Sequence, residues 1–203
     1  MREPGITALE ARPDRREAVP QILGDHRDFL IVTGLAGAAQ DIAGSTSEAP
    51  NTFMLGGAMG GATMMGAGLA LARPDRRVLV VTGDGDLLMS LGSLATIGAL
   101  AISNLAILCI DNERYGETGN QQTHTGMGVK LHLVAAACGI NQAFEVSSRA
   151  NFEKAAKALR APGLAFVLLK VTDGPSIRYR RNWNAVERKI IFQSHLSDAP
   201  GQR

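Results

Sequence analysis

Short apolar segments, each bounded by turn residues, recur along the chain and determine its predicted architecture. Most carry apolar side chains at successive positions rather than at every second position. Strands that are buried on both faces of a parallel sheet have this pattern. The predicted strands are Asp28–Thr33, Thr52–Leu55, Val78–Val81, Leu105–Ile110, the edge-like Phe144–Val146 and Leu164–Val171.

Segments with helical spacing separate these strands. The predicted helices are residues 15–23, 34–43, 62–72, 87–97, 130–137 and 150–159. Asp14, Asp86 and Ser148 are placed to cap the first, fourth and last of them. The third is apolar and small almost all round, which predicts a buried helix whose glycines allow close approach to the sheet or to another subunit.

The alternation of strands and helices predicts an α/β fold. We expect three layers, with a parallel central sheet and helices on both of its faces. The order of elements suggests an N-terminal arm at residues 1–14, a single domain at 15–175 and a polar C-terminal tail at 176–203. Trp183 is the one large apolar residue expected to anchor that tail.

Composition narrows the functional classes. A chain of 203 residues that is 45% hydrophobic can bury one full core. A net charge of +2 gives no reason to expect nucleic acid, and no apolar run approaches the ~20 residues that span a bilayer. Cys109 and Cys138 lie in apolar runs and are expected to be free buried thiols, which favours a cytoplasmic protein.

Polar side chains follow two of the predicted strands directly. Asp84 comes after Val78–Val81 within a Gly-Asp-Gly turn, and Asn112 comes after Leu105–Ile110. Parallel strands joined by one helix end at the same edge of the sheet, so these side chains should face each other there. Carboxylate and amide oxygens suit Mg²⁺, and peptide N–H groups at a helix start favour phosphate. The pattern therefore predicts a metal and diphosphate site.

Gly83-Asp84-Gly85, followed by 26 residues and Asn112, resembles the signature of thiamine diphosphate-dependent enzymes. By this resemblance, Asp84, Asn112 and the backbone carbonyl of Arg114 would hold the Mg²⁺ that anchors the cofactor. Gly83, Gly85 and Asp86 would belong to the cofactor-binding turn. Residues 15–175 would then form the diphosphate-binding domain of that family.

Two further segments extend the resemblance. Leu55–Gly60 is similar to the loop that contacts the cofactor pyrimidine, which implies that Met59 bends the cofactor and that the Gly57 carbonyl accepts from its 4′-amino group, with Ala58 between them. The long polar loop 113–128 would wrap the diphosphate through Tyr115, Gly116, Glu117 and Thr118.

The loop sequences 111–119 and 122–126 look most like those of the sulfopyruvate and phosphonopyruvate decarboxylases. The implied reaction is decarboxylation of a three-carbon 2-oxoacid with a second anionic group. The Glu that engages the cofactor's pyrimidine belongs to another domain in this family. The resemblance therefore implies a β-type subunit that works with a pyrimidine-binding α subunit, as a dimer or hetero-tetramer.

Other interpretations of these residues remain open. Gly-Asp-Gly is also an ordinary turn after a strand, and Met59 could simply fill the core. His124 is either a surface residue or a catalytic proton donor near a bound 2-oxoacid. The chain could instead serve another thiamine-dependent lyase, synthase or 2-oxoacid oxidoreductase, or be a non-catalytic assembly or regulatory subunit.

Overall fold

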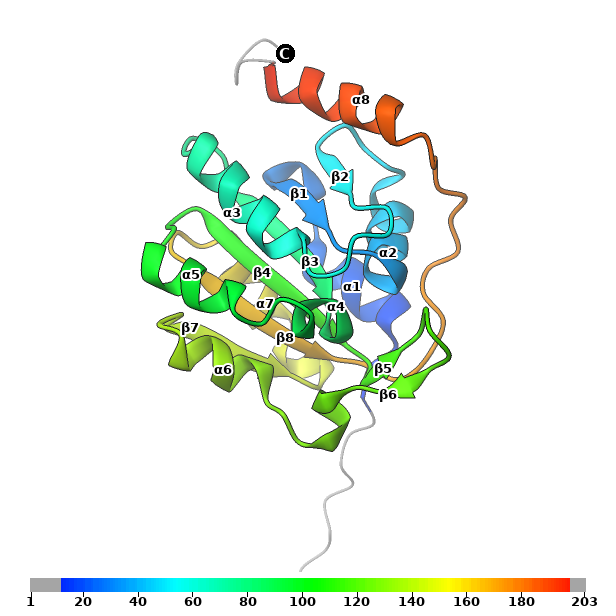
Figure 1. Cartoon of the computed structure of the whole chain (residues 1–203), viewed down its shortest axis with the longest axis vertical. Coiled ribbons are helices and arrows are strands. Elements are labelled where there is room, and N and C mark those ends of the chain that lie inside the picture. Colours follow the sequence, from blue (N-terminus) through cyan, green and yellow to red (C-terminus); the bar gives the residue numbers. More distant parts are fainter. Residues whose placement is uncertain (1–11, 198–203) are drawn as a thin grey trace, which may run out of the picture.

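The computed structural model describes residues 12–197, and its centre is a six-stranded sheet in which every pair of neighbours is parallel. The strand order is β2-β1-β3-β4-β8-β7 (Figure 1). The strands are β1 (Leu30–Thr33), β2 (Thr52–Met54), β3 (Val78–Gly83), β4 (Leu105–Asp111), β7 (Gln142–Val146) and β8 (Ala165–Lys170). This confirms the predicted α/β class, with β7 at an edge as expected.

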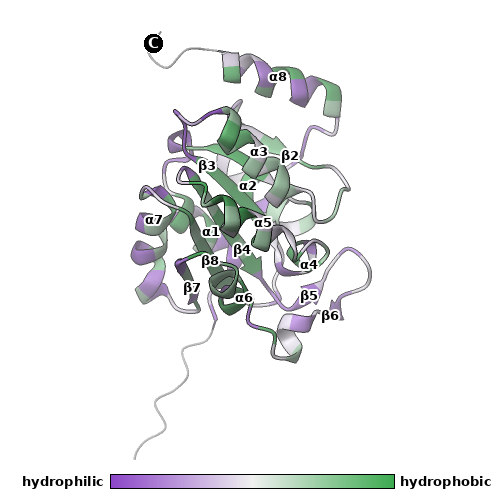
Figure 2. Ribbon diagram, turned by 60° about the vertical axis from the view of Figure 1, so that its left-hand side comes forward, coloured by the Kyte–Doolittle hydropathy of each residue, from purple (hydrophilic) through white to green (hydrophobic). Residues whose placement is uncertain are grey.

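Helices cover both faces of the sheet, which confirms the three-layer prediction (Figures 1 and 2). One apolar cluster joins the sheet to α1 (Arg15–Leu23), α2 (Ala36–Thr46) and α7 (Phe152–Arg160). The other joins the opposite face to α3 (Ala62–Ala72), α4 (Asp84–Leu88), α5 (Ser93–Leu100) and α6 (Leu131–Ala137). Successive residues of a strand belong to different clusters because their side chains alternate between faces.

Two predicted helix starts are wrong in detail. The helix expected at 87–97 is broken into α4 and α5 by a turn, and Asp86 lies within the first turn of α4 instead of capping it. Ser148 makes no capping contact through its side chain. Its backbone carbonyl accepts from Asn151, and a short 3-10 turn there precedes α7. Asp14 does cap α1, as predicted, by accepting from the backbone N–H of Arg16.

Helix α3 has the predicted bounds but not the predicted burial. Its glycine Gly66 packs so closely on the sheet that an added Cβ would lie 2.1 Å from Val80 Cγ2. The opposite side of the helix exposes Met64, Met65 and Leu71. The expectation of a helix buried all round is therefore wrong for this chain, because the sheet covers only one side of it.

The C-terminal segment ends in a helix, α8 (Ala185–Ser197), that the sequence pattern did not reveal. Phe192 anchors this helix to the sheet. Its ring centroid lies 5.5 Å from that of Phe53, a residue of β2. Trp183 is 71% exposed and has Arg181 over its ring, so the predicted tryptophan anchor is wrong. No helix within residues 12–197 is both long enough and apolar enough to cross a bilayer.

Candidate functional site

A pocket opens at the carboxyl ends of β1, β3 and β4. The chain winds outward in opposite directions from β1 and β3, and such a reversal leaves a crevice beyond the strand ends where ligands bind in open α/β sheets. The space between its walls, including open solvent at its mouth, is about 560 Å³. Its lining is Arg15, Leu35, Ala36, Gly37, Ala38, Met59, Gly83, Asp84, Gly85, Asp86, Ile110, Asn112, Arg114, Tyr115, Gly116, Glu117 and Thr118.

The predicted cofactor residues from three separate segments thus meet at one pocket. Met59 comes from the glycine loop before α3, residues 83–86 from the end of β3 and the start of α4, and Asn112 and residues 114–118 from the segment after β4. Gly57 and Ala58 are exposed and lie outside this lining. The side chain of His124 is also exposed and outside it, so no contact in residues 12–197 supports a catalytic role for this histidine.

Glycine is required in the turn after β3. A Cβ on Gly85 would lie 2.6 Å from two ring carbons of Tyr115, which packs directly over the turn. Tyr115 belongs to a small antiparallel hairpin, β5 (Arg114–Tyr115) and β6 (Gln121–Gln122), within the loop that the sequence left without structure. Residues 115–118, in and after β5, line one wall of the pocket.

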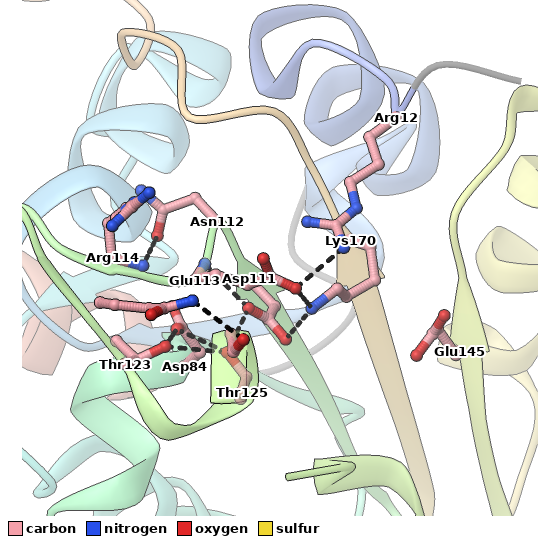
Figure 3. Close-up of polar contacts among 12 residues, drawn as sticks. Arg12, Asp84, Asp111, Asn112, Glu113, Arg114, Thr123, Thr125, Glu145 and Lys170 are labelled. Atoms are coloured by element: carbon pink, nitrogen blue, oxygen red, sulfur yellow. Dashed lines mark hydrogen bonds and ion pairs between the residues drawn. The ribbon is translucent and has the colours of Figure 1, made fainter. Parts of the chain in front are cut away.

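Asp84 is held by two threonine hydroxyls. Its Oδ2 accepts from Thr123 Oγ1 at 2.6 Å and from Thr125 Oγ1 at 3.1 Å, and all three residues are buried (Figure 3). Both hydroxyls contact the same carboxylate oxygen, and the backbone N–H of Gly85 also forms a hydrogen bond with this carboxylate. Burial, followed by the nearby charge of Asp111, raises the pKa of Asp84 to about 6. A divalent ion in the pocket would offset both effects.

Asp111 connects this site to a buried cation. Its Oδ1 lies 2.8 Å from Thr125 Oγ1, whose single proton is shared between this oxygen and Asp84 Oδ2, and its Oδ2 accepts from Lys170 Nζ at 2.9 Å. Lys170 also donates to Glu113 Oε1, which accepts from Arg12 as well (Figure 3). The hydrogen bond from Arg12, followed by those from Lys170, lowers the pKa of Glu113 to about 2. Lys170 therefore offsets the negative charges of Asp111 and Glu113, the residues that precede and follow Asn112 in the sequence.

Asn112 has its side chain fixed from both ends. Its Nδ2 donates to Asp173, and its Oδ1 accepts from the backbone N–H of Arg114 at 3.3 Å. Asn112 and Asp84 both line the pocket, and their side chains carry hard oxygen atoms, which suit Mg²⁺ better than a softer metal. No group of three or more His, Cys, Asp or Glu side chains within residues 12–197 could hold a metal ion. A metal here would need further ligands from water or a phosphate.

Sequence reasoning missed the wall formed by residues 35–38 after β1. Gly37 in this wall leaves room for Arg15, because an added Cβ there would lie 2.5 Å from Arg15 Nη2. Arg15 is buried on α1 and donates through Nε to Asp41 Oδ2 at 2.7 Å. Nothing in the linear pattern of α1 marked this arginine as a neighbour of the pocket.

Comparison with known families agrees with this geometry. The family model described as thiamine pyrophosphate enzyme, C-terminal TPP binding domain, matches residues 36–169. The chain belongs to this family. The matched range includes the glycine loop, the Gly-Asp-Gly turn and Asn112, so the thiamine diphosphate-binding fold predicted from the sequence is confirmed.

Several curated relatives of this chain carry decarboxylase names. The β subunit of sulfopyruvate decarboxylase from Methanothermobacter thermautotrophicus is 37% identical over 77% of this chain and 82% of its own length. The corresponding subunit from Methanocaldococcus jannaschii is 41% identical over 62% of this chain and 65% of its own. Phosphonopyruvate decarboxylase from Streptomyces viridochromogenes is 39% identical over 84% of this chain, but the match spans only 42% of that relative.

Solved structures of thiamine diphosphate enzymes share the fold. Benzoylformate decarboxylase from Polynucleobacter necessarius aligns with a TM-score of 0.62 at 14% identity, over 88% of this chain and 36% of its own. The thiamine diphosphate-dependent 4-hydroxybenzoylformate decarboxylase of Rhodococcus jostii aligns at 0.63 with 16% identity, over 87% and 36%. At these identities the likeness concerns the arrangement of the sheet and helices.

Proposed function

We propose that this chain is the diphosphate- and Mg²⁺-binding subunit of a thiamine diphosphate-dependent 2-oxoacid decarboxylase. The observation that carries the proposal is that Asp84 and Asn112, from the ends of neighbouring strands, line the same pocket as Met59. In a chain whose family binds thiamine pyrophosphate, this pocket places oxygen ligands, an apolar side chain and a glycine turn around one space.

The residues present fit the cofactor and its metal. Asp84 Oδ1, Asn112 Oδ1 and the Arg114 carbonyl would hold Mg²⁺, with the diphosphate and water completing its coordination. The turn at residues 83–86 and the hairpin residues 115–118 would enclose the diphosphate. Met59 would support the bent cofactor, with Gly57 and Ala58 on the same loop toward its pyrimidine. When bound, thiamine diphosphate supplies the carbanion-stabilising chemistry of the reaction.

The proposed substrate is an anionic three-carbon 2-oxoacid such as sulfopyruvate or phosphonopyruvate. Support comes from the names of the relatives, which are 37–41% identical to this chain. It also comes from the positions of residues 115–118, which the resemblance assigned to the active-site loop and which line the pocket. His124, which lies in the same long loop 113–128, remains a proposed proton donor that would act together with residues of the partner subunit.

The proposed partner is a pyrimidine-binding α subunit that supplies the catalytic Glu. In residues 12–197 no glutamate other than Glu117 lines the pocket, and Glu117 comes from the diphosphate-side hairpin. The matches to relatives named as β subunits also cover more of those relatives than the match to phosphonopyruvate decarboxylase does. We propose a cytoplasmic hetero-oligomer, either a dimer or a hetero-tetramer, with the active site at the subunit interface.

The test is reconstitution with a candidate α subunit, sought first among the products of the genes adjacent to that of this chain, in the presence of thiamine diphosphate and Mg²⁺. A panel should compare sulfopyruvate and phosphonopyruvate with pyruvate and 2-oxobutyrate, with CO₂ release as the readout. We expect activity only when both subunits are present, and a preference for sulfopyruvate or phosphonopyruvate over the uncharged side chains of the panel. Preference for an uncharged side chain contradicts the substrate assignment, and full activity of this chain alone contradicts the need for a partner.

A second candidate function has weaker support. A segment of 58 residues, 29% of this chain, is 43% identical to the 2-oxoglutarate synthase subunit KorB of Methanocaldococcus jannaschii. An oxidoreductase component would require coenzyme A and an electron acceptor for turnover. A reconstituted pair that releases CO₂ only when these are added would favour that function over the decarboxylase.

A further inference from the structure

Asp86 is an unexpected residue for a turn that faces a diphosphate, because a second carboxylate there would repel the ligand. Its side chain is nevertheless buried, at 5% exposure. The position of its two oxygens explains how the charge is accommodated. Oδ2 accepts from Thr82 Oγ1 at 2.6 Å, and Oδ1 accepts from the backbone N–H of Gly60 at 2.5 Å.

The second of these contacts joins two segments that are distant in sequence. Gly60 belongs to the loop that carries Met59, whereas Asp86 belongs to α4 after β3. A hydrogen bond between a carboxylate and a backbone amide is charge-assisted and stronger than a neutral one. The contact therefore holds the loop at Gly60, one residue after Met59, which lines the pocket.

Gly60 is also held through its carbonyl group. Ser90, in the turn between α4 and α5, donates to the Gly60 carbonyl oxygen at 2.6 Å. Gly60 has a φ of +78°, and an added Cβ would lie 3.0 Å from the Cβ of Ser90. Only glycine can adopt this backbone conformation so close to the turn at modest cost.

Gly34 leaves the space that the Asp86 carboxylate occupies. A Cβ on Gly34, after β1, would lie 1.7 Å from Asp86 Oδ2, so any larger residue there would displace the side chain. Thr82, which donates to the same oxygen, is buried at the end of β3. The side chain of Asp86 is thus fixed by elements that belong to the sheet itself.

We propose that Asp86 is a positioning residue that locks the Met59 loop to α4, so that the pyrimidine-side and diphosphate-side walls of the pocket keep one relative position. This inference rests on the proposed function for the meaning of the two walls. It assigns Asp86 a positioning role between the Met59 loop and α4, whereas the family resemblance implied only that Asp86 belongs to the cofactor-binding turn. Asp86 lines the pocket, but both of its carboxylate oxygens accept hydrogen bonds from within the chain.

Two variants separate this role from simple charge repulsion. Asp86→Asn removes the charge but keeps an oxygen for the Gly60 N–H, and its amide can donate to Thr82 Oγ1. Asp86→Ala removes both contacts. If Asp86 only repelled the diphosphate, both variants would bind thiamine diphosphate and Mg²⁺ more tightly. If it positions the loop, Asp86→Ala binds about tenfold more weakly, and Asp86→Asn stays within about threefold of the wild type.

The experiment combines calorimetry of thiamine diphosphate binding in saturating Mg²⁺ with amide hydrogen exchange of the cofactor-free full-length chain. We expect Gly60 exchange to become at least about tenfold faster in Asp86→Ala and to stay near the wild-type rate in Asp86→Asn. Unchanged Gly60 exchange in Asp86→Ala overturns the inference, as does tighter cofactor binding by both variants. A wild-type chain that binds no cofactor overturns the proposed function instead, and the exchange of Gly60 then decides the positioning role alone.

Discussion

The side-chain amide of Asn112 donates a hydrogen bond to Asp173, with Nδ2 3.2 Å from Oδ1. A carboxylate can only accept, so Asp173 fixes which end of the amide faces it and turns Oδ1 to the other side. The second oxygen of Asp173 accepts from Asn120 Nδ2 at 2.9 Å, and Arg114 Nε lies 3.9 Å from it. Asp173, in the segment that follows β8, therefore orients both a proposed metal ligand, Asn112, and the neighbouring hairpin.

Asp173→Ala should weaken Mg²⁺-dependent binding of thiamine diphosphate by about three- to tenfold, because partners behind metal ligands contribute on this scale. Titration calorimetry at several Mg²⁺ concentrations measures the effect. Asp75→Ala is the matched control, since Asp75 also pairs with an arginine and has a side-chain exposure of 43% against 42% for Asp173. Equal affinities of the two variants would show that Asp173 does not orient the site.

Thr125→Val should lower Mg²⁺ affinity by about tenfold, because it removes the hydroxyl that joins Asp84 to Asp111 while keeping the side-chain shape. Thr125→Ser keeps the hydroxyl and should restore most of the affinity. Mn²⁺ binding followed by electron paramagnetic resonance gives the readout. Thr52→Val is the control, because Thr52 is a buried threonine that donates to Ala49 far from the pocket. An equal loss in both valine variants would point to a general effect on folding.

The stability of the metal-free chain should depend on pH through Asp84. Folding raises the pKa of Asp84 from 3.8 to about 6, so the folded chain retains a proton that the unfolded chain has released within this window. Unfolding free energy should therefore fall as pH rises from about 4 to about 6, by on the order of 2 kcal/mol. Denaturant titrations with and without Mg²⁺, on the wild type and Asp84→Asn, measure it. A pH profile that Asp84→Asn leaves unchanged contradicts this assignment.

Phe192→Ala should destabilise the chain by about 2–3 kcal/mol, because Phe192 is 7% exposed and packs on Phe53. Trp183→Ala should change stability by less than about 0.5 kcal/mol, since most of its side chain faces solvent. Thermal unfolding of both variants compares the two anchors. A larger loss from the tryptophan variant would reverse the account of how α8 is attached.

The sheet and most of its helices could be predicted because each element is marked by the spacing of its own apolar residues, which is a local property of the sequence. Val78–Gly83 and Leu105–Asp111 lie at the centre of the sheet, where both faces must be apolar, and their pattern is unambiguous. The turn that divides α4 from α5 could not be predicted in the same way. It depends on Ser90 reaching Gly60, a contact between residues thirty positions apart.

The pocket was predictable where the chain repeats a known spacing, at Asp84, Asn112 and Met59. The residues that hold these groups were not, because Thr125, Asp173 and Lys170 reach the site through the fold rather than through their position in a motif. Asp86 shows the same limit of local reasoning. A carboxylate at the start of a helix ordinarily caps it, but here the amide of Gly60 competes for that oxygen.

The central claim is that Asp84 and Asn112 together hold a divalent ion that anchors thiamine diphosphate. Its most direct test is calorimetric titration of the full-length chain with thiamine diphosphate, with Mg²⁺ and with EDTA, for the wild type and for Asp84→Ala. We predict binding by the wild type only when Mg²⁺ is present, and a loss on the order of 100-fold in Asp84→Ala. Equal binding in Mg²⁺ and in EDTA, or by the wild type and Asp84→Ala, would contradict the account.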